Sequence, residues 1–169
     1  EIHRRLVGSE MCIRDSVTTI TSSSLDAINT LYTSGGFSGL GDQDITASDS
    51  GSIAASTISA IAAANSSGTL NVSGAATITG TAAEIIAAFA DGTVTEASNV
   101  ALTVSGTATL AQAIDLNALT TGVVTATLAD TSVSDLLGDS GLTETGGTNA
   151  YTITIGTGDA EITAANLNS

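Results

Sequence analysis

Acidic side chains beside Gly and Ser are the residues of this sequence best suited to binding chemistry. Hard cations such as Ca²⁺ take oxygen ligands from carboxylates in turns, so these acids are predicted as possible calcium ligands. Each acid also has a plainer interpretation, as a solvated turn residue or as the partner of a helix N-terminus, and the sequence leaves both open. The candidate ligands are Asp42, Asp44, Asp49, Asp139, Glu144, Asp159 and Glu161.

The segment GLGDQDITASDSG contains the first three of these acids. Its Gly-x-Gly-Asp-x-Asp order resembles calcium-binding nonapeptide repeats, but it occurs once, whereas those sites need stacked copies. The helix-loop-helix calcium pattern does not fit either, because Ile53 stands where the closing Glu is required. No cofactor other than calcium is predicted.

Catalysis has few residues to work with in this chain. After Ser16 the sequence contains no His, Lys, Arg, Cys or Met, which removes His-activated nucleophiles and cationic clamps. Asp130-Thr131-Ser132 resembles an aspartic-protease triplet, but neighbouring units have Gly at the position of Asp130, so we interpret it as a helix cap. The chain is predicted not to be an enzyme. A carbohydrate-active enzyme that uses paired carboxylates is kept as a remote alternative.

The charge distribution limits the partners. The first sixteen residues hold three acids and three arginines, so the net charge of −14 comes from the fourteen Asp and Glu that follow. A polyanion cannot neutralise phosphates, which excludes ordinary nucleic-acid binding, and no apolar run is long enough to span a bilayer. With 42% hydrophobic and 12% charged residues, the chain can still bury a core.

The segment Glu1–Ser16 differs from the rest in composition and is predicted to be non-native. It contains all of the Arg residues and the His, Cys and Met of the chain. The string LVGSEMCIRDS resembles a translated sequencing-library adapter, which is found in proteins from fragmentary metagenomic assemblies. Residues 17–169 are therefore expected to be a fragment of a repeat array, truncated at both ends.

A unit of about 27 residues recurs about six times in residues 17–169. Each unit has a short run in which Thr alternates with aliphatic residues, the pattern of a strand, then a small polar turn and an Ala-rich stretch. Aliphatics in these stretches recur at three or four residues, as in Leu25, Ile28 and Leu31, which predicts helices. The stretches begin near Ser24, Ser52, Ala82, Ala108, Ser132 and Asp159.

Local signals agree with these helices. Thr81 and Glu84 have the spacing of a capping box. Gly92, Gly122 and Gly138 follow predicted helices, where a left-handed cap is favoured.

The predicted fold class is α/β, a repeat solenoid of strand-turn-helix units with one parallel sheet. Consecutive parallel strands joined by helices give this arrangement, and a parallel β-helix is the alternative. Alternation along the strands predicts an outer face of Thr hydroxyls. The outward residues would be Thr103, Thr125, Thr127, Thr152 and Thr154, with Leu102, Val104, Val124, Ala126, Ile153 and Ile155 facing inward.

The segments LTVSGTATLAQAIDLNALTTGVVTATLADTSVSDLL and GLTETGGTNAYTITIGTGDAEITAANLNS resemble repeats of very large surface proteins of marine bacteria, especially cyanobacteria. The resemblance covers roughly Thr69 to Ser169. It implies an exported chain, extracellular or on the cell surface, with a structural or adhesive role. The implied partners are neighbouring repeats of the same parent chain, surface glycans or other cell-surface proteins. A calcium-dependent ligand-binding surface module is the alternative function.

Overall fold

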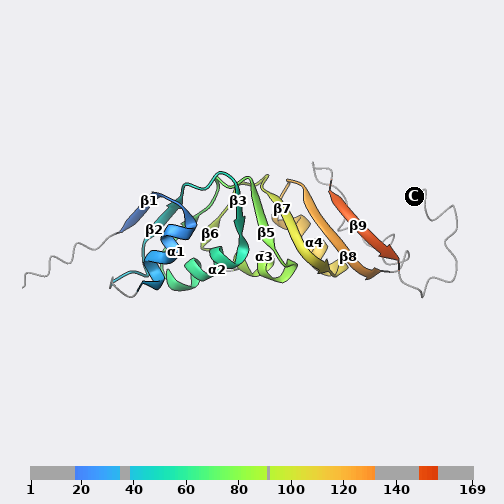
Figure 1. Ribbon diagram of the computed structural model, residues 1–169, viewed down its shortest axis with the longest axis horizontal. Helices are drawn as coiled ribbons and strands as arrows, with labels where there is room; N and C mark the ends of the chain where they lie inside the picture. The colour runs from blue at the N-terminus through green and yellow to red at the C-terminus, as the bar shows by residue number, and fades with distance from the viewer. Residues whose placement is uncertain (1–17, 35–38, 91, 132–148, 156–169) are drawn as a thin grey trace, which may run out of the picture.

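The computed structural model describes residues 18–34, 39–90, 92–131 and 149–155 (Figure 1). Within these ranges helices follow strands along the chain, and all strand pairs are parallel, which confirms the α/β class. The helices are α1 (Leu25–Thr33), α2 (Ala55–Ala64), α3 (Ala82–Ala88) and α4 (Leu110–Leu119). The strands are β1 (Thr19–Ser23), β2 (Asp44–Ala47), β3 (Ser52–Ala54), β4 (Leu70–Asn71), β5 (Thr77–Gly80), β6 (Val94–Thr95), β7 (Ala101–Ala108), β8 (Val124–Thr131) and β9 (Ala150–Ile155).

The strands form two sheets, where the sequence predicted one. The four-stranded sheet has the order β1-β2-β4-β6, and the five-stranded sheet has the order β3-β5-β7-β8-β9. Strands β3, β4 and β6 contain two or three residues each. Such short strands cannot display a period of two, and for this reason the alternation pattern missed them.

Most strand partners lie 24 or 25 residues apart in sequence, while β7 and β8 pair at 22 residues before a bulge and 20 after it. Ile45 pairs with Leu70, which pairs with Val94, giving offsets of 25 and 24 residues in the four-stranded sheet. Ile53 pairs with Ile78, which pairs with Leu102, giving the same two offsets in the five-stranded sheet. These offsets are shorter than the predicted 27-residue unit.

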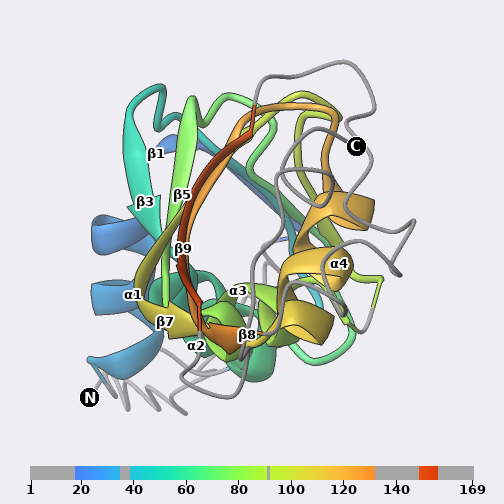
Figure 2. The same cartoon turned by 90° about the vertical axis from the view of Figure 1, so that its right-hand side faces the viewer.

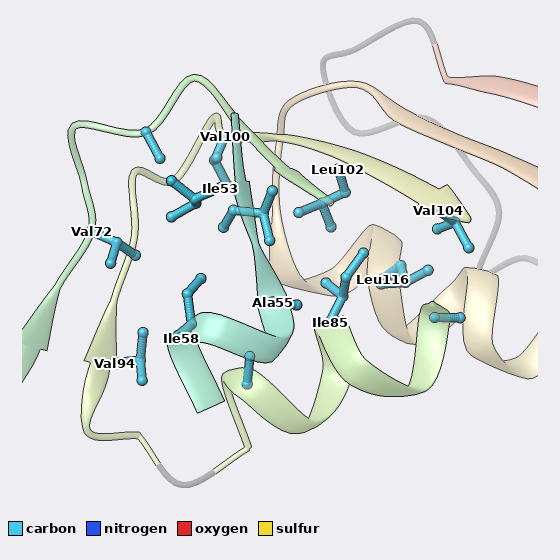
Figure 3. Close-up of a cluster of buried hydrophobic side chains, with 14 of the residues drawn as sticks. Ile53, Ala55, Ile58, Val72, Ile85, Val94, Val100, Leu102, Val104 and Leu116 are labelled. Atoms are coloured by element: carbon cyan, nitrogen blue, oxygen red, sulfur yellow. The ribbon is translucent and has the colours of Figure 1, made fainter. Parts of the chain in front are cut away.

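The core is enclosed by the two sheets and the helices, which surround a common interior in the end-on view (Figure 2). Each helix contributes two or three buried residues spaced three positions apart, and strand residues such as Leu102 point toward them (Figure 3). Burying one Ile or Leu side chain contributes about 1.5–3 kcal/mol, so stacked aliphatic rows are the main stabilising feature. The buried helical residues are Leu25 and Ile28 in α1, Ala55, Ile58 and Ile61 in α2, Ala82, Ile85 and Ala88 in α3, and Ala113 and Leu116 in α4.

The predicted helix starts are largely confirmed. Ser24 caps α1, and Thr81 with Glu84 forms the predicted capping box of α3. The helix expected near Ser52 begins at Ala55, because Ser52–Ala54 pairs with β5 as a strand. The stretches predicted to begin at Ser132 and Asp159 lie outside the described residues.

The predicted glycine caps divide into two cases. Gly92 has the expected left-handed conformation, φ +72°, but it does not cap the helix, because α3 ends at Ala88 and its C-cap is Phe89. Gly122 does not adopt a positive φ; instead, a Cβ there would collide with the carbonyl oxygens of Asn99 and Val100. Close backbone approach therefore requires glycine at this position. Gly138 lies outside the described residues.

The predicted inward and outward faces are mostly correct. Leu102, Val104, Val124 and Ala126 are buried, while Thr103, Thr125 and Thr152 are exposed. Ile153 was predicted to face inward but is 43% exposed. It lies on β9, the last strand of the five-stranded sheet, whose outer side has no described strand to cover it. The side chains of Thr154 and Ile155 lie outside the described set.

The longest described helices, α2 and α4, contain 10 residues each, and none of the described helices is long and apolar enough to span a membrane.

Candidate functional site

The three predicted calcium ligands that the structure describes each bond to a different part of the protein. The carboxylate of Asp42 accepts a hydrogen bond from Gln43 Nε2, and that of Asp44 accepts one from the Thr69 hydroxyl at 2.8 Å. Asp49 Oδ2 accepts one from the backbone N–H of Leu25 at 2.8 Å. Among the described residues no three His, Cys, Asp or Glu side chains gather as a metal site. Asp139, Glu144, Asp159 and Glu161 lie outside these residues, and calcium binding stays a prediction.

The Asp49 carboxylate caps α1, a helix that begins 24 residues earlier in the sequence. Strand β1 ends beside the end of β2, and Ser48 donates its backbone N–H to the Ser23 carbonyl at 3.0 Å. This pairing brings the Asp49 carboxylate to the first residue of α1. The Ser24 hydroxyl accepts a second N–H, from Ala27 at 3.3 Å. Two of the amides left unpaired at the start of a helix are thus satisfied, that of Ala27 by the nearby Ser24 and that of Leu25 by a residue 24 positions later.

A buried amide cluster lies at the other end of α1. Asn65 exchanges two hydrogen bonds with the backbone of Gln43, accepting from its N–H at 2.9 Å and donating to its carbonyl at 2.7 Å. The Tyr32 hydroxyl lies 3.0 Å from the side-chain oxygens of both residues. Burial raises the pKa of Tyr32, and the charge of Asp42 raises that pKa further, so the phenol stays protonated as a donor.

The two amide side chains of this cluster are too deeply buried to bind a ligand, although Tyr32 is partly exposed. Gln43 is 0% and Asn65 1% exposed. Asn65 takes the place of a backbone segment in pairing with Gln43, and Gly68 allows the close approach because a Cβ there would collide with the Gln43 carbonyl. The role of the cluster is therefore structural: its hydrogen bonds join the residue before β2 to the residue after α2, at a place where no described strands pair.

A groove of about 300 Å³ lies between the N-terminus of α1 and the outer face of the five-stranded sheet. Strands β3 and β5 provide its sheet side, and residues of α1 and α2 contribute the rest of the lining. Asp49 fixes one wall, since it bonds to the first residue of α1. The lining residues are Leu25, Asp26, Asp49, Ser52, Ile53, Ala54, Thr57 and Thr79.

The groove opens on an uncharged sheet face. Thr79 pairs with Thr103, which pairs with Thr125, and these three residues form a threonine row across the sheet. Neighbouring strands lie about 4.8 Å apart, so hydroxyl and methyl groups recur at that interval along the row. The described outward positions of the five-stranded sheet carry no Asp, Glu, Lys or Arg. They are Ser52, Ala54, Thr77, Thr79, Ala101, Thr103, Ser105, Thr107, Thr125, Thr127, Ala150 and Thr152.

The sequence predicted Thr103 and Thr125 of the threonine row but neither Thr79 nor the groove. Asp49 was selected as a calcium ligand, and the structure uses it as a cap. Asp26, Ser52 and Thr57 were not selected, because they lie on three different elements and share no motif. A unit length of 24 or 25 residues would have provided the signal, since it places Asp49 beside the start of α1.

Comparison with protein-family models, with curated proteins and with solved structures gives no match to this chain.

Proposed function

We propose that this chain is a solenoid segment of a large secreted or cell-surface protein, with a structural and adhesive role and no catalytic activity. In this proposal one coil runs from a strand of the four-stranded sheet, through a strand of the other sheet and a helix, to the next strand. Residues 70–93 are an example, containing β4, β5 and α3. Neighbouring coils of the parent chain are its first partners.

The register of the parallel strands is the observation that carries this proposal. Equivalent aliphatic residues pair across successive strands in both sheets, such as Ile53 with Ile78 and Ile78 with Leu102. A stack built in this way stabilises each coil through its nearest neighbours. It also extends in one direction without needing a new type of core.

The surface chemistry supports adhesion outside the cell over catalysis. The chain has no Lys, Arg or His after Ser16, and its net charge is −14. The described carboxylates of Asp44, Asp49 and Glu84 bond to residues of the protein itself, as a strand link or as helix caps. A repeated, uncharged hydroxyl face is suited to many weak contacts along a partner. Such contacts gain strength by multivalency.

The test is to lengthen the stack. Three additional copies of residues 70–93 inserted after Thr93 preserve every junction, because Leu70 and Val94 hold paired positions. We expect small-angle X-ray scattering to show a particle about 15 Å longer, at about 4.8 Å per coil, with an unchanged cross-sectional radius. Inserting the same residues in scrambled order is the control. A particle that thickens in all directions, or copies that unfold like the scrambled ones, would disprove the solenoid.

A further inference from the structure

We infer that the groove beside α1 binds one sugar unit of a neutral polysaccharide, whose chain continues along the threonine row. This inference rests on the proposed adhesive function and names its ligand class. The groove has a volume of about 300 Å³, at the lower end of the range of about 300–1,000 Å³ for small-molecule sites. That space suits one ring better than several.

The lining of the groove matches the surface of a sugar. A sugar ring presents hydroxyl donors at its edge and C–H groups on its faces. Asp26 has no described hydrogen-bond partner for its side chain, and the bond to Leu25 occupies only Oδ2 of Asp49. These oxygens can accept from adjacent sugar hydroxyls, in charge-assisted bonds. Ala54, an outward residue of β3, provides apolar contact, whereas the Ile53 side chain is buried in the core.

Hydroxyl side chains complete the polar lining. Ser52, Thr57 and Thr79 come from three different elements, β3, α2 and β5. The Thr79 hydroxyl donates its proton to the Ile53 carbonyl at 3.2 Å, so its oxygen keeps acceptor capacity for a ligand. A hydroxyl both donates and accepts, which suits partners that do the same.

Charged ligands fit the groove less well. An anion would meet Asp26 and Asp49 without a cationic residue beside them. A cation would find two carboxylates, but Asp49 already bonds to the N-terminus of α1. The partial positive charge of that helix end repels a cation bound beside it. A neutral ligand rich in hydroxyl groups avoids both costs.

The threonine row favours a polymer over a free sugar. It starts in the groove at Thr79 and crosses the sheet through Thr103 to Thr125. A chain lying along it meets a methyl and a hydroxyl about every 4.8 Å and no charge. The groove then fixes one unit, while the row contributes repeated weak contacts.

Affinity electrophoresis of the full chain in native gels tests this inference. The gels contain galactomannan, xyloglucan or the anionic polymer alginate. We expect at least one of the two neutral polymers to retard the chain and alginate to leave it unretarded. Asp26→Asn and Thr79→Val should weaken the retarding interaction at least tenfold. Asp115→Asn and Thr95→Val, exposed positions outside the groove with matched changes in charge and shape, should keep wild-type retardation.

Each outcome decides the inference. Thermal melts by circular dichroism identify any variant that has lost its fold, and Asp26→Ala and Thr79→Ala then replace it. No retardation by either neutral polymer overturns the ligand class, while the lengthened stack still tests the structural role separately. If the groove variants and the controls are retarded equally, the groove is not the binding site, while the proposed adhesive function is not refuted. Release of new reducing ends from a polymer would show hydrolysis and overturn binding without catalysis.

Discussion

Asn65→Ala tests whether a single buried amide holds the chain where strand pairing is interrupted. The side chain is 1% exposed and exchanges two hydrogen bonds with Gln43, whose N–H and carbonyl lose these partners in the variant. An orphaned buried polar group costs about 1–3 kcal/mol. Two such groups lower the free energy of unfolding by about 2–6 kcal/mol, with Tyr32 losing one of its two acceptors in addition.

Urea unfolding followed by far-ultraviolet circular dichroism measures this loss, since the chain has no Trp. With m values of about 1–3 kcal/mol/M, the midpoint should fall by at least about 0.7 M. Asn71→Ala is the matched control, because the Asn71 side chain, at the end of β4, accepts one exposed bond from the Ser73 backbone N–H. We expect that variant to lose less than about 1 kcal/mol. Equal and small losses in both variants would refute the assignment of a structural role to the buried amide.

Three further predictions use other parts of the structure. Gly122→Ala should lower the free energy of unfolding by about 2–3 kcal/mol, because a Cβ would collide with the Asn99 and Val100 carbonyls. The control Gly51→Ala, where a Cβ meets open space, should stay within about 1 kcal/mol of wild type. Similar urea midpoints for the two variants would contradict the close approach at Gly122. Thr81 lowers the pKa of Glu84 through hydrogen bonds to its carboxylate, so this stabilisation is present above the unfolded pKa of about 4.5 and is lost as pH falls through the lower folded value. Glu84→Gln should therefore flatten the decline of the thermal midpoint below about pH 4.5, and an unchanged pH profile would argue against the charged cap. Asp49→Asn should lower the thermal midpoint equally in calcium and in chelator, because the carboxylate caps α1; a decrease confined to calcium would instead favour metal ligation.

The sequence by itself determined the class of the fold and much of its local structure. Alternating Thr and aliphatic residues located β5, β7 and β8, and the spacing of Thr81 and Glu84 located the start of α3. These features depend on neighbours within a few residues, so their signals are complete in the sequence. The uncharged outer face followed from the same alternation, since the pleat sends successive side chains to opposite sides.

Tertiary structure decided the second sheet, the groove and the role of each acid. Strands β4 and β6 contain two residues each and exist only because parallel neighbours pair with them. Asp49 meets α1, and Asn65 meets Gln43, across separations of more than twenty residues. Such contacts depend on the 24- or 25-residue register between strands. That register is set by packing between stacked segments, and no local pattern specifies it.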